Sequence, residues 1–382
     1  MSRGVAILGS TGSIGRSTLA VLDRHPDRFR VVALAANRNA AELQAQCDRY
    51  RPDLCVLVDE TIANGHAAAS GWRTGRNALI EAATHPDADI VLNAVVGAAG
   101  LEASLAALTA GKRLALANKE SLVAAGPVVL EAARAGGGEL VPVDSEHSAI
   151  LQCLKENTTR DVERLVLTAS GGPFRAIRAE DLQNVTPAQA LRHPTWDMGA
   201  KITIDSATLV NKALEVIEAH FLFGVDYDHI DVVVHPQSII HSMVEFIDGS
   251  VLAQLGFPTM EMPILYALTY PERIADDGPR RFDPVAAGQL TFETVDTQRF
   301  PAFGLGIEAG RAGGTMPAVF NAANEVAVTR FLAGELPFPE IASVIEETMQ
   351  SHDVRAADSL ETILAVDHEA RVHAREVLIR RC

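Results

Sequence analysis

Residues 5–15 read VAILGSTGSIG and decide the fold of the first part of the chain. Four apolar residues predict a buried strand, Val5–Leu8, and three glycines follow it at once with the spacing GxxGxxG. Glycines at these places permit a tight turn and let backbone N–H groups approach a pyrophosphate at the positive end of a helix. The stretch therefore predicts a strand, a turn and a helix of the dinucleotide-binding type, with an ordinary glycine turn as the alternative.

Short β-like runs continue to alternate with Ala-rich helical stretches up to about residue 144. Helices are expected over Leu101–Ala110 and Ser121–Ala135. Repeated strand–helix–strand order predicts a parallel sheet with helices on both faces. The further strand candidates are Val31–Ala35, Leu54–Val58, Ile90–Ala94, Arg113–Ala117 and Glu139–Val143.

The pattern changes after residue 144. Val162–Thr168 predicts a strand, and a helix is expected to begin near Ser206. Ile239–Ile247 and Val251–Leu255 flank Asp248-Gly249, which predicts a β-hairpin. We expect an α/β protein with four segments: a Rossmann-like domain (1–144), a central α+β catalytic domain (145–270), a proline-containing linker (271–300) and a helical C-terminal domain (301–382), in which Asn321, Asn324 and Glu325 are expected on a helix surface.

Composition narrows the class of partner. The chain has 382 residues, 48% of them hydrophobic, and a net charge of −16 without a long basic run, so nucleic acid and anionic membrane surfaces are not expected partners. No apolar run approaches the roughly 20 residues of a membrane-spanning helix, and the first strand begins too early for a signal peptide. Four cysteines without metal-ligand spacing predict reduced thiols and a cytoplasmic location.

The end of the second predicted strand indicates the cofactor. An NAD-binding protein usually has an acidic residue there, which binds the ribose 2′-hydroxyl. This chain has Asn37-Arg38-Asn39 instead. A guanidinium with two amides suits a 2′-phosphate, and the sequence therefore predicts NADP(H).

The segment VPVDSEH (141–147) sets two carboxylates beside the end of a strand. On an extended backbone Asp144 and Glu146 would point to one face. A third carboxylate, Glu215, shares a helix face with Asn211 and Lys212. Three carboxylates without His or Cys favour Mg²⁺ or Mn²⁺ over zinc. Sequence spacing alone does not show that residues 144–146 and 215 meet in space. The alternatives are a helix start at Asp144 and an exposed helix face at Glu215.

Candidate phosphate ligands lie in the same central region. Ser170-Gly171-Gly172 follows a strand and offers a hydroxyl and flexible amides. Ser206 is expected where a helix begins, near free N–H groups and the positive dipole end, although a simple N-cap is an equal alternative. Lys212 adds a full positive charge.

Seven motifs occur in order: GSTGSIG, ANKES (117–121), DSEH (144–147), SGGPF (170–174), RHPTWDMG (192–199), DSATLVNKALE (205–215) and HPQSIIHSM (235–243). Together they resemble the 1-deoxy-D-xylulose 5-phosphate reductoisomerase family over essentially the whole chain. The resemblance implies NADPH- and divalent-metal-dependent rearrangement and reduction of that sugar phosphate to 2-C-methyl-D-erythritol 4-phosphate, in non-mevalonate isoprenoid biosynthesis. It also implies a homodimer.

The resemblance assigns roles to individual positions. It implies a mobile lid over residues 192–199 and catalytic roles for Lys119, Glu146, His193 and His241. A buried core histidine is an equal alternative for His241. The implied metal ligands are Asp144, Glu146 and Glu215. The implied substrate ligands are Lys119, Ser145, Glu146, Ser170, His193, Trp196, Met198, Ser206, Asn211, Lys212 and Glu215. The implied NADPH contacts are Thr11, Gly12, Ser13, Ile14, Asn37, Arg38, Asn39, Asn118, Glu120 and Gly199.

Two rival functions fit parts of the same sequence. A metal-independent NADP-dependent aldehyde or semialdehyde dehydrogenase would keep the glycine turn without needing the three carboxylates to converge. A non-enzymatic NADP-binding regulator would use its second domain to recognise a partner, and would tolerate Glu215→Gln.

Overall fold

The computed structural model describes residues 2–65, 71–154 and 159–381. The chain forms two compact units, and each unit is assembled from separate stretches of sequence. The first unit contains Met1–Ser121, Val129–Ser148 and Thr259–Arg280, and the second contains Leu122–Val128, Ala149–Pro258 and Arg281–Cys382. The four-segment division expected from the sequence stays a prediction.

The first unit is built on a parallel sheet, as predicted. The strands lie in the order β4-β3-β2-β1-β5-β6-β7, and all neighbouring pairs run parallel. β1 and β5 are buried apolar strands because helices cover both faces of such a sheet. The bounds are β1 (Arg3–Leu8), β2 (Phe29–Ala36), β3 (Leu54–Leu57), β4 (Arg73–Thr74), β5 (Ile90–Asn93), β6 (Arg113–Leu116) and β7 (Glu139–Pro142), so that six predicted strands are confirmed and β4 is an addition.

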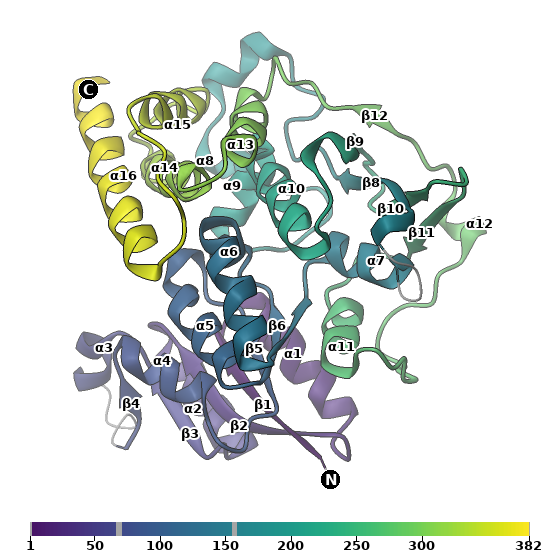
Figure 1. Cartoon of the computed structure of the whole chain (residues 1–382), viewed down its shortest axis with the longest axis vertical. Coiled ribbons are helices and arrows are strands. Elements are labelled where there is room, and N and C mark those ends of the chain that lie inside the picture. The colour runs from purple at the N-terminus through teal and green to yellow at the C-terminus, as the bar shows by residue number, and fades with distance from the viewer. Residues whose placement is uncertain (1, 66–70, 155–158, 382) are drawn as a thin grey trace. The chain divides into compact units, whose positions relative to one another are not determined.

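The chain returns from one edge of this sheet to its middle between β4 and β5. The strand order reverses at β1 and β5, which is where dinucleotide-binding sheets open a crevice at their carboxyl ends. The helices are α1 (Ser13–Arg24), α2 (Ala40–Tyr50), α3 (Glu60–Gly65), α4 (Arg76–Ala83), α5 (Leu101–Thr109) and α6 (Lys119–Gly136), with the short η2 (Gly97–Gly100) before α5. The later helix α11 (Glu261–Thr269) joins this unit against α1, where Arg24 pairs with Glu261 and Asp276 (Figure 1).

One expectation about the cysteines is wrong. Cys47, near the end of α2, and Cys55, in β3, are joined by a disulfide, with their Cα atoms 6.9 Å apart. The left-handed turn at Arg51 brings the end of α2 back beside β3, and this places the two thiols next to each other. Cys153 is a free, buried thiol.

The second unit contains a mixed sheet in the order β11-β10-β8-β9-β12. β10 (Ile240–Phe246) and β11 (Val251–Leu255) form the predicted antiparallel hairpin. β8 (Val162–Ala169) pairs parallel to β9 (Ile230–Val234) and antiparallel to β10. A short strand, β12 (Glu293–Thr294), lies in the stretch expected to be a linker and pairs with β9.

Helices make up the rest of the second unit, and the predicted helical C-terminus is confirmed. α14 (Met316–Leu332), α15 (Glu340–Gln350) and α16 (Leu360–Arg381) lie side by side (Figure 1). They share a hydrophobic core with α9 (Ala200–Thr208), α10 (Val210–Phe223) and α13 (Pro301–Ala312). The shorter helices are α8 (Pro187–Ala190), α12 (Pro284–Ala287), η3 (Thr159–Asp161), η4 (Ala179–Asn184) and η5 (Tyr227–His229), and α7 (Ser145–Leu154) passes from the first unit into the second. No helix in the described ranges is both long and apolar enough to cross a membrane.

Two sequence expectations about these helices are wrong. A helix does not begin near Ser206, because α9 already begins at Ala200 and Ser206 lies in its last turn. The second concerns α14, where Asn321 and Asn324 are buried rather than on the surface, each with an exposed fraction of 0%. Both amides lie on a helix that is buried on most sides.

Candidate active site

The glycine turn after β1 is shaped for a close approach of the backbone. Gly9 has a left-handed φ of 89°, and a Cβ atom there would lie 2.6 Å from the carbonyl oxygen of Ala94. Gly12 is the N-cap of α1, with no side-chain capping bond, so the first-turn N–H groups of that helix are available to an anion. Thr11, Ser13 and Ile14 surround this turn and are not fully buried.

The turn after β2 divides its three predicted residues between two tasks. The side chain of Asn39 caps α2, accepting the N–H of Glu42 at 3.3 Å. Arg38 is 69% exposed and its Nε lies 3.1 Å from a carboxylate oxygen of Asp59. The guanidinium is therefore the charge that this turn presents to solvent, and Asn37 beside it is also exposed.

The start of α6 combines structural and charged residues. The buried Asn118 donates hydrogen bonds from Nδ2 to the carbonyl oxygens of Val95 (2.6 Å) and Gly97 (2.8 Å), which fixes the loop after β5. Lys119 is buried and forms an ion pair with Asp144. Glu120, also buried, has a carboxylate oxygen 3.2 Å from the same Nδ2 of Asn118.

The DSEH segment differs from its expected geometry. β7 ends at Pro142 and α7 begins at Ser145, so Asp144 and Glu146 do not share an extended backbone. Ser145 Oγ donates to a carboxylate oxygen of Glu146 at 2.5 Å. Burial alone would raise the pKa of Asp144, but the nearby Lys119 ammonium, with His147 and a hydrogen bond to Glu146, holds that pKa below its ordinary value.

The predicted polar face of α10 is present and is withdrawn from solvent. Lys212 and Glu215 have exposed fractions of 4% and 1% and form an ion pair. Asn211 Nδ2 donates to the other oxygen of Glu215 at 2.5 Å, and Lys212 Nζ donates to the carbonyl oxygen of Thr168 at 2.5 Å. The bond to Thr168 ties α10 to the end of β8, where the SGG turn begins.

A histidine of the predicted lid binds this turn. The backbone N–H groups of Thr195 and Trp196 donate to Nδ1 of His193, at 3.1 and 2.9 Å. Nδ1 is therefore unprotonated and Nε2 carries the proton, which it donates to Ser170 Oγ at 3.0 Å. Burial lowers the pKa of His193 to about 4, so the imidazole is neutral at pH 7.

The hydroxyl of Ser170 is left with its own proton to donate. Its oxygen accepts from His193 and from the N–H of Gly172, the latter at 3.2 Å. Gly172 in turn lies against Ser206: a Cβ atom at Gly172 would be 2.5 Å from the Ser206 carbonyl oxygen. The backbone of Ser206 and Nζ of Lys212 thus both lie beside the turn that carries Ser170. Hydroxyl and ammonium groups are donors that can bind a phosphate.

The remaining predicted residues of the second unit are His241, Trp196, Met198 and Gly199. His241 is buried, and Nε2 has no hydrogen-bond partner among the described residues. Burial, with the charges of His235 and Lys212, lowers the pKa of His241 to about 4. Trp196 and Met198 are half-buried, and Gly199 is the exposed N-cap of α9.

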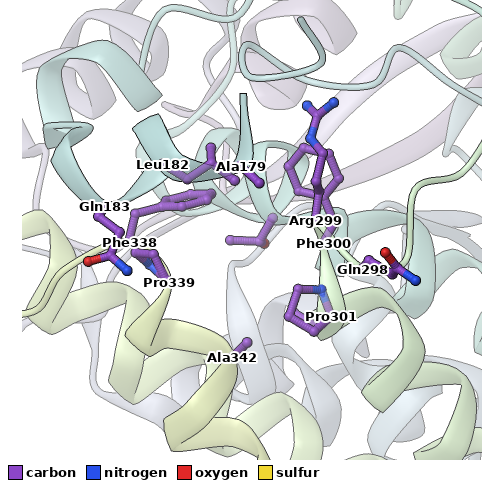
Figure 2. Close-up of a pocket in the computed structure, with 12 residues that line it drawn as sticks. Ala179, Leu182, Gln183, Gln298, Arg299, Phe300, Pro301, Phe338, Pro339 and Ala342 are labelled. Carbon is purple, nitrogen blue, oxygen red and sulfur yellow. The ribbon is translucent and has the colours of Figure 1, made fainter. Parts of the chain in front are cut away.

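A separate cavity lies within the second unit, and Thr208, two residues after Ser206, is part of its lining. Figure 2 shows its lining of Phe300, Phe338 and Pro339 beside Arg299, and its volume is about 190 Å³. None of its lining residues is a predicted site residue. One functional candidate that the sequence did not single out is Asp205, which lies beside Ser206 and is almost wholly buried.

A Rossmann-type sheet with an exposed arginine after β2, in one chain with a serine- and glycine-containing turn and buried carboxylates, is the arrangement of an NADP-dependent oxidoreductase. Comparison with known proteins gives the particular family. Models of 1-deoxy-D-xylulose 5-phosphate reductoisomerase match residues 5–126, and models of its C-terminal domains match residues 140–223 and 255–373. The chain belongs to the 1-deoxy-D-xylulose 5-phosphate reductoisomerase family.

Individual relatives agree over the full length. The reductoisomerase of Symbiobacterium thermophilum is 54% identical, and the alignment covers 100% of both chains. The solved structure of the Zymomonas mobilis enzyme in complex with NADPH is 44% identical with a TM-score of 0.91, covering 99% of both chains. A reductoisomerase crystallised with NADPH, fosmidomycin and magnesium is 40% identical with a TM-score of 0.92, covering 98% of both.

Proposed function

We propose that this protein converts 1-deoxy-D-xylulose 5-phosphate to 2-C-methyl-D-erythritol 4-phosphate, using NADPH and a divalent cation. The observation that carries the proposal is the gathering of Ser170, Ser206 and Lys212 around one turn, in a chain that also has the nucleotide-binding sheet. The family relationship supports 1-deoxy-D-xylulose 5-phosphate as the sugar phosphate that those donors bind.

The second unit anchors the substrate by its phosphate. Ser170 donates its hydroxyl proton, Ser206 adds a second hydroxyl, and Lys212 with Asn211 supplies a charge and an amide. Because this anchor is remote from the reacting carbons, its binding energy can orient the carbon skeleton and stabilise a closed lid. His193 links the lid to the anchor, since the same imidazole bonds Ser170 and the backbone at Thr195 and Trp196.

The first unit binds NADPH, which supplies the hydride that reduces the aldehyde formed by rearrangement. The first-turn N–H groups of α1, with Thr11, Gly12, Ser13 and Ile14, hold the pyrophosphate, and Arg38 with Asn37 and Asn39 receives the 2′-phosphate. Since Asn118 uses its side-chain amide within the protein, we place its cofactor contact at the backbone. Glu120 and Gly199 complete the proposed set of NADPH contacts.

Asp144, Glu146 and Glu215 are the proposed metal ligands. Asp144 and Glu215 are largely buried, and each forms an ion pair with a lysine of its own unit. Both carboxylates are therefore in surroundings that already hold a positive charge beside them. Their hard oxygen atoms suit Mg²⁺ or Mn²⁺. The bound cation would act as a Lewis acid toward the substrate oxygens that gain negative charge.

Other side chains act on the substrate directly. Lys119 is proposed at the reacting end, where its ammonium favours developing negative charge, and Ser145 contacts a substrate hydroxyl. Trp196 and Met198 cover the bound sugar and exclude water. His241 is proposed to orient the site as a neutral imidazole, consistent with the burial that lowers its pKa.

The direct test measures NADPH oxidation with 1-deoxy-D-xylulose 5-phosphate, with Mg²⁺ or Mn²⁺ and after removal of divalent cations, and identifies the product by mass spectrometry and NMR. We expect turnover only with the cation. Unchanged turnover without it would favour the metal-independent dehydrogenase. No oxidation under any condition, with Glu215→Gln tolerated, would favour the regulator.

We further propose a cytoplasmic homodimer that binds neither nucleic acid nor membrane. The outer strand β11 leaves Val251, Leu252 and Leu255 exposed, and Ile247 beside it is 66% exposed, which supports an interface between two copies at this edge. Light scattering would test the dimer. Cell fractionation would test the location, because a disulfide such as Cys47–Cys55 is rare in cytoplasmic proteins.

A further inference from the structure

Asp205 is a buried carboxylate with two directional partners in the second unit. Its side chain accepts from Lys201 Nζ at 2.8 Å, one turn earlier on α9, and from Asn324 Nδ2 at 2.8 Å, on α14. Its own exposed fraction is 1% and that of Asn324 is 0%. A carboxylate so far from water is costly unless both kinds of partner are kept in place.

The position of Asp205 in α9 links the predicted lid to the phosphate anchor. α9 begins at Ala200, directly after the lid, and its N-cap Gly199 makes no side-chain capping bond. Lys201 lies in that first turn, where the helix dipole disfavours a positive charge, and Asp205 compensates it. The next residue is Ser206, whose carbonyl oxygen meets Gly172 of the SGG turn.

The contact with α14 fixes the helix from the other side. The carboxylate of Asp205 can only accept, so the Asn324 amide must present Nδ2 to it, and its orientation is determined. Asn321, one turn earlier on α14, donates to Glu325 at 3.1 Å, and Glu325 pairs with Arg371 of α16 at 2.7 Å. Polar contacts therefore accompany α14 from Asp205 toward the C-terminal helix.

Stability alone does not account for this arrangement. Well-packed apolar residues of similar volume often stabilise a core as much as a buried ion pair. What a carboxylate adds is direction, because its bonds fix both the rotation of α9 about its axis and its height against α14. A rotation of α9 would move the hydroxyl of Ser206, which lies about 100° around the helix from Asp205.

We propose that Asp205 is a positioning residue, which holds Ser206 in register with the substrate phosphate by fastening α9 to Lys201 and Asn324. The proposal rests on the proposed function, since it concerns the phosphate of that substrate. Asp205 acts through Ser206 and does not itself contact the substrate.

Asp205→Asn keeps the shape of the side chain and removes its charge. We expect the KM for 1-deoxy-D-xylulose 5-phosphate to rise about tenfold, with kcat changed less than about threefold and the Kd for NADPH unchanged. Asp276→Asn is the matched control, because it makes the same change in a buried carboxylate, which pairs with Arg24 at 2.7 Å in the first unit. The control should leave KM at the wild-type value.

A double-mutant cycle with Ser206→Ala distinguishes positioning from a general loss of structure. If Asp205 acts through Ser206, adding Asp205→Asn to Ser206→Ala should raise KM by less than about twofold, whereas independent effects would multiply. A full tenfold further rise, in variants whose Tm shows them folded, would overturn the proposal. So would a wild-type KM in folded Asp205→Asn.

Asn324→Ala keeps the test decisive if Asp205→Asn does not fold. It retains the ion pair with Lys201 and removes only the contact with α14, so we expect a smaller rise of KM, about threefold, in the same direction. An unchanged KM in this folded variant would overturn the proposal. Failure of the proposed function would be distinguishable, because the wild-type protein itself would then not turn over the substrate.

Discussion

Replacing Gly172 by alanine is expected to weaken substrate binding as well as the fold. Gly172 has a φ of 67°, a left-handed conformation that costs a residue with a side chain about 1–2 kcal/mol. Its new Cβ atom would also lie 2.5 Å from the Ser206 carbonyl oxygen, and relieving that overlap to an ordinary 3.4 Å contact needs a separation of about 0.9 Å. The oxygen belongs to backbone, so no side chain can rotate away.

The displacement falls within the phosphate anchor. Gly172 N–H bonds Ser170 Oγ, and so the turn would move Ser170 relative to Ser206 by most of that distance. A misplacement of about 1 Å can cost around a hundredfold in catalytic efficiency. We therefore expect KM for 1-deoxy-D-xylulose 5-phosphate to rise between about 10- and 100-fold, while the Kd for NADPH is unchanged, because the nucleotide turn belongs to the other unit.

Gly224→Ala is the matched control. Gly224 caps α10 with a φ of 64°, and a Cβ atom there would have no neighbour within 4 Å. It should show the backbone cost as a similar loss of Tm, with KM unchanged. Steady-state kinetics and thermal unfolding of both variants test the reasoning. If the two variants have the same KM, then contact between the SGG turn and Ser206 does not position the phosphate ligands.

Three further predictions concern the cofactor, the metal and the histidines. Arg38→Met should raise the Kd for NADPH about 10- to 100-fold and leave that for NADH nearly unchanged, because only NADPH carries the phosphate; equal losses in fluorescence titrations would exclude this role. Glu146→Gln should lower kcat at least about 100-fold while calorimetry shows a normal NADPH Kd, and loss of both would indicate misfolding instead. His193 and His241 should titrate near pH 4 by NMR; because the unfolded chain binds these protons at higher pH, they should reduce stability as pH falls from about 6.5 to 4, and midpoints near 6.5 would contradict the burial argument.

The sequence predicts the sheet of the first unit well, because fully buried parallel strands have continuous apolar runs with glycine between strand and helix. Val5–Leu8 and Ile90–Ala94 are found within a residue or two of their expected bounds. The strand β4 is missed because Arg73 and Thr74 form an edge too short to have a period. The sequence also misplaces the polar residues of α14. A polar side chain indicates exposure only when it has no buried partner, and the partner of Asn324, Asp205, is 119 residues away in the sequence.

Local sequence indicates the residue types of the phosphate anchor but not their meeting. Ser170 and Lys212 come together because Lys212 donates a hydrogen bond to the carbonyl oxygen of Thr168 near the end of β8. Spacing along the sequence does not predict a contact between residues so far apart. The sequence predicts a helix start near Ser206. The actual break is three residues later, at Leu209, where a leucine adopts a conformation that sequence patterns associate with glycine.

Leu209 shows why such a break is retained. It is both the last cap of α9 and the first cap of α10, with a φ of 61° that costs about 1–2 kcal/mol. Glycine would remove that strain, but the leucine side chain is 4% exposed within the core, and burying it contributes about 1.5–3 kcal/mol. Burial therefore outweighs strain at this position. The chain therefore has a fixed bend between Ser206 and Lys212, which lets one residue of α9 and one of α10 face the proposed phosphate site. On a straight helix, two residues six positions apart would point in different directions.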